Sequence, residues 1–317
     1  MSRTAQPARI RVIGSINMDN YTYCNEHTHL FGHYRSRDGK RIPGGHGANQ
    51  AVACARLSRQ RPKEPKRPSF STMGGLLTRG SNSASTQPIG PPDVVIKVYM
   101  SGVVGKDEDG KECVDELKRA GVDTTGIQDI TKLTLTPAPD PKTRTGVANI
   151  ELDRHRRERI NSVPGANNYV DISLFPSLPN PRPDLLLLQL EIPLNTVLHL
   201  ITCAHKQGVP VILNAAPIEM EHQALPALTY ARIDHLICNE NQADCLTKRE
   251  IKFERRDDRW ALYKHYFEAC DQLHSLGARR VVITLAELGV IASVVELGDA
   301  ETDKKVKLDR ELSLIHI

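Results

Sequence analysis

Apolar segments with the length of a β-strand alternate with helical segments through the second half of the chain. The apolar segments are Leu185–Leu190, Val209–Leu213, Ile233–Cys238, Arg280–Leu285 and Val290–Val295, and the helical ones are Leu194–Lys206, Glu219–Leu228 and about Asp257–Leu276. Strands that are apolar on both sides are typical of parallel sheets covered by helices on both faces. The pattern therefore predicts an α/β fold.

The first half of the chain contains fewer regular segments. It is expected to contribute strands at Ile10–Ile13, Val94–Val104 and Arg144–Leu152, and helices at Ala48–Leu57 and Asp109–Ala120. Between Arg59 and Pro92 the residues are rich in proline, serine and glycine. Their apolar residues repeat neither every second residue, as in a strand, nor every 3.6 residues, as in a helix. Such a composition is typical of a flexible insertion.

Composition excludes several classes of protein. A net charge of +4 from 42 basic and 38 acidic residues is too small to indicate a nucleic-acid-binding surface. The 7 cysteines include no CxxC pair, so neither a zinc site nor a disulfide framework is indicated. The N-terminus lacks the apolar core of a signal peptide, and no apolar run is long enough to span a bilayer. We expect a soluble intracellular protein that does not bind membranes.

Polar residues follow the apolar strands at the points where those strands end. They are Asn17, Asp19, Glu191, Asn214, Asn239, Gln242 and Thr284. The carboxyl ends of parallel strands share one edge of the sheet, where ligands bind. Carboxylates and amides at one edge suit a polyhydroxylated ligand, although any one of these residues could instead be a helix cap or a turn residue.

A glycine-rich segment precedes the first predicted helix. In Gly44-Gly45-His46-Gly47-Ala48-Asn49 the glycines allow backbone amides to approach a ligand closely. An ordinary turn before a helix remains the alternative, because the chain has no GxxxxGK[ST] phosphate loop. The nearby histidines at 27, 29 and 33 do not have the spacing of a zinc site.

Taken in order, these segments resemble the ribokinases of the PfkB carbohydrate kinase family. The motifs that carry the resemblance are GSINMD at 14–19, GGHGANQAV at 44–52, SGVVG at 101–105 with Asp107 and Gly110, PGAN at 164–167, QLE at 189–191 and LNAAP at 213–217. The resemblance implies a three-layer α/β sandwich over about residues 9–297, with a small β-sheet lid formed by 21–42 and 144–160. It also implies a fungal-like insertion at 59–92 and a tail unlike the family at 298–317.

The resemblance further implies ATP-dependent phosphorylation of D-ribose to ribose 5-phosphate. The residues expected to bind the sugar are Asn17, Asp19, Gly45, His46, Asn49 and Glu191, and those expected to bind ATP are Asn239 and Thr284. Mg²⁺ is expected with ATP, and K⁺ in the family at a site that this sequence lacks. The resemblance also implies a homodimer formed through the lid and a location in the cytoplasm, with the nucleus as a second location.

The sequence departs from the family on the phosphate side of the reaction. Gln242 stands where relatives carry a metal-organising glutamate, His46 replaces a lysine, and Ala286 replaces a glycine. The Gly-Ala-Gly-Asp motif, which supplies the anion hole and the catalytic base, is absent. The pair Gly298-Asp299 is expected to be a hairpin turn rather than a substitute.

We therefore expect a C-terminally truncated chain with impaired catalysis and no catalytic residue of its own. One alternative is a non-catalytic protein that binds ribose or pairs with an intact kinase. Another is a chain that does not fold stably, because the missing terminal segments would leave a sheet edge and apolar surface exposed.

Overall fold

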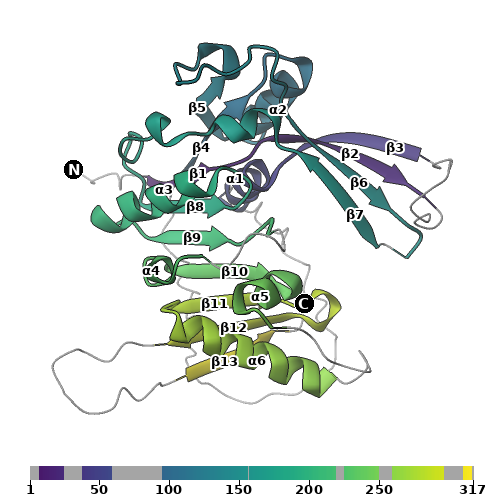
Figure 1. The fold of residues 1–317 in the computed structure, drawn as a ribbon, viewed down its shortest axis with the longest axis vertical. Helices are drawn as coiled ribbons and strands as arrows, with labels where there is room; N and C mark the ends of the chain where they lie inside the picture. The colour runs from purple at the N-terminus through teal and green to yellow at the C-terminus, as the bar shows by residue number, and fades with distance from the viewer. Residues whose placement is uncertain are drawn as a thin grey trace, which may run out of the picture.

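The computed structural model describes residues 7–24, 38–58, 95–155, 157–218, 225–249, 259–295 and 310–315. These residues form one large sheet, a separate small sheet, and helices packed against the large sheet (Figure 1). The predicted insertion at 59–92, the lid residues 25–37 and the Gly298-Asp299 turn lie outside the described residues.

The large sheet contains nine strands in the order β13-β12-β11-β10-β9-β8-β1-β4-β5. Their bounds are β1 (Ala8–Ile13), β4 (Ile96–Val104), β5 (Asp123–Asp129), β8 (Leu185–Gln189), β9 (Val211–Asn214), β10 (His235–Asn239), β11 (Arg280–Thr284), β12 (Val290–Val295) and β13 (Arg310–Ile315). All neighbours pair in parallel except β11–β12 and β12–β13, which are antiparallel. The predicted mainly parallel α/β sheet is confirmed.

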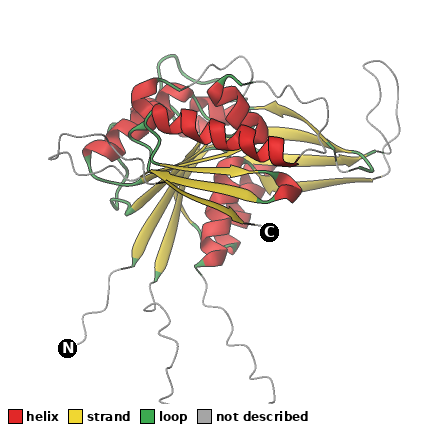
Figure 2. Cartoon of the chain, turned by 90° about the horizontal axis from the view of Figure 1, so that it is seen from below, coloured by secondary structure: helices red, strands yellow, loops and turns green. Residues whose placement is uncertain are grey.

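Helices cover both faces of this sheet (Figure 2). Their bounds are α1 (His46–Leu57), α2 (Glu108–Arg119), α3 (Leu194–Lys206), α4 (Ala227–Tyr230), α5 (Glu240–Thr247) and α6 (Arg259–Ser275). None of the helices in the described part combines the length and apolarity that crossing a bilayer demands.

The two faces of the sheet carry two separate hydrophobic cores. In β8, Leu186 and Leu188 pack in the core that includes α3, α5 and α6, whereas Leu187 packs in the core of α1 and α2. Alternate residues of a strand point to opposite faces, so a continuous apolar run is what a sheet buried on both sides requires. The leucine run of β8 therefore joins the three layers.

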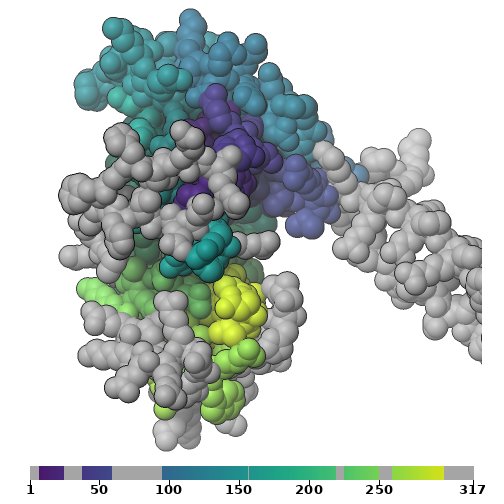
Figure 3. All heavy atoms as spheres, turned by 90° about the vertical axis from the view of Figure 1, so that its right-hand side faces the viewer, coloured from purple at the N-terminus to yellow at the C-terminus, as the bar shows by residue number. Residues whose placement is uncertain are grey.

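The small sheet, here called the lid, projects from the N-terminal half of the molecule (Figure 1). Its order is β3-β2-β6-β7, with bounds β2 (Asn17–Tyr23), β3 (Asp38–Gly44), β6 (Gly146–Leu152) and β7 (Glu158–Val163). Seen from the lid side, the purple to blue residues occupy the upper part of the molecule and the green to yellow residues the lower part (Figure 3).

The structure differs from the sequence analysis in a few elements. The helix predicted over Glu219–Leu228 is wrong in its described part, where a helix spans only Ala227–Tyr230. Pro226, in an extended conformation, directly precedes this helix. A proline ring clashes with a preceding helical turn, so the helix begins after Pro226. Strands β5 and β13 and helix α5 were not predicted.

Candidate active site

The turn after β1 and the start of α1 lie against each other. Gly45 has a φ of 90°, which favours glycine, and a Cβ placed there would lie 2.8 Å from the backbone nitrogen of Asn17. A Cβ on Gly47 would lie 2.7 Å from the backbone nitrogen of Ser15. The glycines of the 44–47 segment are therefore needed to bring the first turn of α1 onto the 15–17 backbone.

Glu191, just after β8, connects these two segments. Its Oε2 accepts hydrogen bonds from Ser15 Oγ at 2.5 Å and from the His46 backbone nitrogen at 3.0 Å, and it lies 2.8 Å from His46 Nδ1. Its Oε1 accepts from Asn17 Nδ2 at 2.8 Å. These bonds occupy most of the carboxylate's lone pairs, so Glu191 acts mainly as an organiser of the site.

The charge on Glu191 is stabilised by these contacts. Burial alone would raise the pKa of this carboxyl, but the hydrogen bond and charge of His46 and the bond from Ser15 outweigh it and lower the pKa to about 2. Burial is the largest single effect on His46 and lowers its pKa, but the hydrogen bond to Glu191 and the charges of Glu191 and Asp19 together outweigh it, and the net pKa is raised. A protonated His46 paired with an ionised Glu191 is the favoured state.

Asp19 on β2 is in the opposite situation. The residue is only 9% exposed, and within the described residues its carboxylate has no hydrogen-bond or ion-pair partner. Burial, with the nearby charge of Glu191, raises its pKa to about 6. A Cβ on Gly44 would lie 2.0 Å from Asp19 Oδ2, so glycine at 44 makes room for this side chain.

The six residues expected to bind sugar line one cavity of about 160 Å³, here called the first cavity. They are Asn17, Asp19, Gly45, His46, Asn49 and Glu191. Their shared position is thus established, whereas their role in binding sugar remains a prediction. Asp19 supplies a buried oxygen acceptor to this space that no described protein group uses.

The lid supplies the other wall of the first cavity. Besides Asn17 and Asp19 of β2, the residues of the lid that line it are Tyr21, Ala148, Ile150, Glu158, Ile160 and Ser162. Ala148 pairs with Ser162 and Ile150 with Ile160 across β6 and β7. Of the residues from Tyr21 to Ser162, the sequence analysis placed all except Ser162 in the lid but did not single them out, although the period of two in a strand would have assigned them to one face.

The two residues expected to bind ATP lie together at the carboxyl ends of neighbouring strands of the large sheet. Asn239 and Thr284 end β10 and β11, where they are directly paired in register, and both are exposed. Asn214 ends β9 and lies opposite Gln189 of β8. The structure therefore brings the two expected nucleotide contacts to one place, separate from the first cavity.

Gln242 has a structural role that the sequence analysis left open as an alternative. Asn239 Oδ1 accepts from the Gln242 backbone nitrogen at 2.9 Å, and Gln242 Oε1 accepts from the Asn239 backbone nitrogen at 2.8 Å. This reciprocal pair is a capping box at the start of α5. Its amide oxygen is engaged, and it lacks the charge that Mg²⁺ prefers, so Gln242 does not fit a metal ligand. The described residues contain no group of three or more histidine, cysteine or acidic side chains that could hold a metal.

Comparison with known proteins identifies the family of this fold. The model of the "pfkB family carbohydrate kinase" matches residues 89–307. The chain is a member of the pfkB family of carbohydrate kinases. A ribokinase of Schizosaccharomyces pombe is 32% identical over 250 residues, covering 78% of this chain and 61% of the relative. A ribokinase of Haemophilus influenzae is 27% identical over 286 residues, covering 90% of this chain and 74% of the relative.

The fold of this pfkB family member is also found in solved structures. An Arabidopsis thaliana ribokinase in complex with ribose and ATP gives a TM-score of 0.60 at 21% identity, with 90% of this chain and 74% of that chain covered. The likeness supports the ribokinase-type three-layer sandwich with a lid. The chain thus spans about three fifths of the yeast relative's length and about three quarters of the bacterial one's.

Proposed function

We propose that the chain binds D-ribose in the first cavity and belongs to a protein that phosphorylates the sugar with ATP to give ribose 5-phosphate. The observation that carries this proposal is Asp19, a buried carboxylate that faces the cavity without a described partner. An ionised carboxylate bound to sugar hydroxyls forms charge-assisted hydrogen bonds. The named activities of the pfkB relatives support the same substrate class.

The other residues of the first cavity divide into two groups in this proposal. Asn49 and His46, at the start of α1, present an amide and an imidazole to the hydroxyls of the sugar. Ala148, Ile150 and Ile160 present an apolar surface to the carbon face of the sugar ring. A pocket with a few fixed polar groups and an apolar wall suits a small polyol.

ATP belongs to the proposal at Asn239 and Thr284, which end neighbouring strands. Mg²⁺ is proposed to accompany ATP, since phosphoryl transfer requires the phosphate charge to be shared. No step is assigned to a metal held by Gln242, because that side chain completes the capping box of α5. K⁺ dependence and a location in the cytoplasm and nucleus are carried into the proposal from the family resemblance alone.

Phosphoryl transfer by residues 1–317 is proposed to be impaired. Deprotonation of the attacking hydroxyl needs a base, and the developing charge needs an anion hole. The family supplies both with a Gly-Ala-Gly-Asp segment, and residues 1–317 contain no such segment. The same chain would then bind ribose without turning it over, which is the behaviour of a ribose-binding or kinase-pairing regulator.

Titration calorimetry with ribose tests the binding proposal. We expect heat of binding from the folded chain and an affinity at least ~10-fold weaker in Asp19→Asn, as loss of a charged hydrogen bond implies. No change is expected in Asp115→Asn, at a half-exposed aspartate of α2 that lies outside the first cavity. An ADP-release assay should give only background rates. Absence of heat from folded protein would contradict the binding proposal, and ordinary turnover would contradict the proposed impairment.

A further inference from the structure

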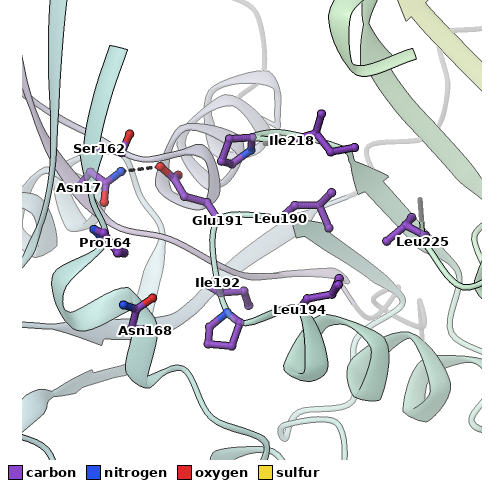
Figure 4. Close-up of a pocket in the computed structure, with 12 residues that line it drawn as sticks. Asn17, Ser162, Pro164, Asn168, Leu190, Glu191, Ile192, Leu194, Ile218 and Leu225 are labelled. Carbon is purple, nitrogen blue, oxygen red and sulfur yellow. Dashed lines mark hydrogen bonds between the residues drawn. The ribbon is translucent and has the colours of Figure 1, made fainter. Parts of the chain in front are cut away.

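The lid has a second hollow of about 820 Å³ on the face opposite the first cavity, here called the outer groove. Asn17 and Glu191, whose hydrogen bond is shown in Figure 4, line the first cavity together with Ser162. Val163, the next residue of β7, lines the outer groove. Alternate residues of a strand point to opposite faces of a sheet. The two hollows therefore open on opposite faces of the lid, and Tyr21 is the one lining residue that they share.

The residues that line the outer groove carry an excess of positive charge. Three of them are basic, namely Lys40 and Arg41 of β3 and Arg144 shortly before β6. The acidic one is Asp109, in the first turn of α2. Asp107 adds a second negative charge near the groove, with its Oδ2 at 3.7 Å from Arg144 Nε. Three cations beside two carboxylates still leave one positive charge without compensation.

The buried carboxylate of Asp109 holds two guanidinium groups next to each other. Its Oδ1 pairs with Arg41 Nη2, and its Oδ2 lies 3.5 Å from Arg144 Nη2. Arg41 Nε also donates a hydrogen bond to Asn20 Oδ1 at 3.3 Å. These contacts position the cations before any ligand arrives, which reduces the conformational entropy that is lost on binding.

The hydrogen-bond donors that remain unused in the outer groove belong to its cations. Among the described residues, Lys40 Nζ and the Nη1 atoms of Arg41 and Arg144 form no hydrogen bond or ion pair. The amide of Asn20 is engaged, since its Nδ2 donates to Asn149 Oδ1 at 3.1 Å. Arginine and lysine side chains have donors and no acceptors. A ligand of this groove must therefore supply oxygen acceptors and negative charge.

We propose that the outer groove binds a phosphate group, either free or carried as a monoester on a small molecule. Arg41 and Arg144 would each donate from a guanidinium fork to two phosphate oxygens, and Lys40 would add a point charge. None of the six residues expected to bind sugar lines the outer groove, so the inference does not depend on the proposed function. It also differs from the proposed ATP contacts, Asn239 and Thr284, which lie on the large sheet.

Calorimetric titration of the full chain with inorganic phosphate and with ribose 5-phosphate, at constant ionic strength, tests the inference. Arg144→Gln should weaken both ligands at least ~10-fold, because it removes charge-assisted hydrogen bonds. Lys40→Gln, at a second exposed position, should weaken both at least ~3-fold, because it removes a point charge without a fork.

Arg56→Gln on α1 is the matched control. Arg56 is 65% exposed, compared with 72% for Arg144, and it too pairs with an acidic side chain, Glu116, but it lies outside the outer groove. The variant removes the same charge elsewhere on the molecule and should change affinity by less than ~2-fold. Equal weakening in Arg56→Gln and Arg144→Gln would show attraction to the net charge alone and would overturn the site.

Ribose 5-phosphate can also enter the first cavity, so its titration is repeated in Asp19→Asn. Affinity within ~2-fold of the parent in this variant supports the outer groove. Binding that is lost in Asp19→Asn and unchanged in Arg144→Gln places the ester in the first cavity and overturns the inference. Absence of heat with both anions from folded protein overturns it as well. Tighter binding of ribose 5-phosphate than of inorganic phosphate assigns the groove to a sugar phosphate, and equal binding assigns it to free phosphate, both of which support a phosphate site.

Discussion

Asp19 and Glu191 are two buried carboxylates of one cavity whose surroundings give them opposite energetics. Glu191 receives hydrogen bonds from Ser15, Asn17 and His46, so its ionised form is stabilised by folding. Asp19 has lost water without gaining a described partner, so its ionised form is destabilised. This arrangement is expected if the Asp19 carboxylate binds the ligand and the Glu191 carboxylate fixes the positions of the surrounding residues.

Replacing each carboxylate by its amide should therefore change stability in opposite directions. The pKa of Asp19 is raised to about 6, so its charge costs stability above that pH, and Asp19→Asn should stabilise the fold by ~2 kcal/mol at pH 7. The pKa of Glu191 is lowered to about 2, so its charge contributes stability above pH 4.5 that is lost as pH falls toward 2. Glu191→Gln should destabilise by ~2 kcal/mol.

Urea unfolding at pH 7 measures both changes, and Asp115→Asn, at a half-exposed aspartate that pairs only with Lys118 at 3.6 Å among the described residues, serves as the reference. A loss of stability in Asp19→Asn would show that this carboxylate has a structural partner. No loss in Glu191→Gln would contradict its role as organiser of the turn between Ser15 and His46.

Ribose binding should depend on pH through Asp19. Protonation removes the charge that strengthens its hydrogen bonds to hydroxyl groups, and its pKa is raised to about 6 by burial and by Glu191. Affinity measured calorimetrically should thus be constant above pH 7 and fall as pH decreases from 7 to 5. Asp19→Asn should bind weakly with no such fall, and an equally steep fall in this variant would assign the titration to another group, such as His46.

At the residue scale, the sequence predicted which side chains meet but not what each one does. Asn17, Asp19 and Glu191 were located because polar residues that follow strands share one edge of a parallel sheet. That Glu191 is saturated while Asp19 is free depends on distances set by the packing of α1 against the 15–17 turn. Such distances cannot be predicted from the spacing of residues in the sequence.

At the scale of elements, α5 shows how a polar pattern can have two interpretations. Its start, Asn239 to Gln242, was singled out for nucleotide and metal chemistry, and it forms a capping box. The helix itself was not predicted, because Glu240–Thr247 is short and its first turn is polar. Strand β5 was missed for a related reason: it lies at the edge of the sheet, where Asp123–Asp129 needs little apolar character.

The capping box predicts unequal effects of two substitutions. Asn239→Ala removes the acceptor for the Gln242 backbone nitrogen and should lower stability by ~1 kcal/mol. Gln242→Glu retains a side chain that can accept from the Asn239 backbone nitrogen and should change stability by less than ~0.5 kcal/mol. Thermal unfolding compares them.

The Gln242→Glu variant also tests whether a carboxylate at this position strengthens the effect of Mg²⁺ on ATP binding. Titration of an ATP analogue with and without Mg²⁺ should show a larger metal effect in Gln242→Glu than in the parent, because a carboxylate is restored. In the thermal unfolding experiment, equal destabilisation by Asn239→Ala and Gln242→Glu would contradict the assignment of the capping box.

At the scale of the whole molecule, the lid is tied to the body by acidic residues at the start of α2. Asp107 accepts from Thr145 Oγ at 2.7 Å just before β6, and Asp109 forms ion pairs with Arg41 of β3 and Arg144. The sequence predicted the existence of the lid from the family resemblance. The bracing of the lid by Asp107 and Asp109 joins residues far apart in the chain and could be found only in the structure.

The exposed edge of the lid carries the last prediction, which concerns assembly. Every residue of β7 is exposed, including the apolar Ile160 and Val163 at 56% and 55%, and β7 is an edge strand of its sheet. An exposed apolar edge favours pairing with another strand. If the chain forms the homodimer that the family resemblance implies, sedimentation equilibrium at micromolar concentration should give twice the chain mass of 35.2 kDa. Val163→Lys, outside the first cavity, should shift the protein toward monomer. A monomeric parent chain would contradict assembly through the lid, whereas a dimer that withstands Val163→Lys would place the contact on another surface.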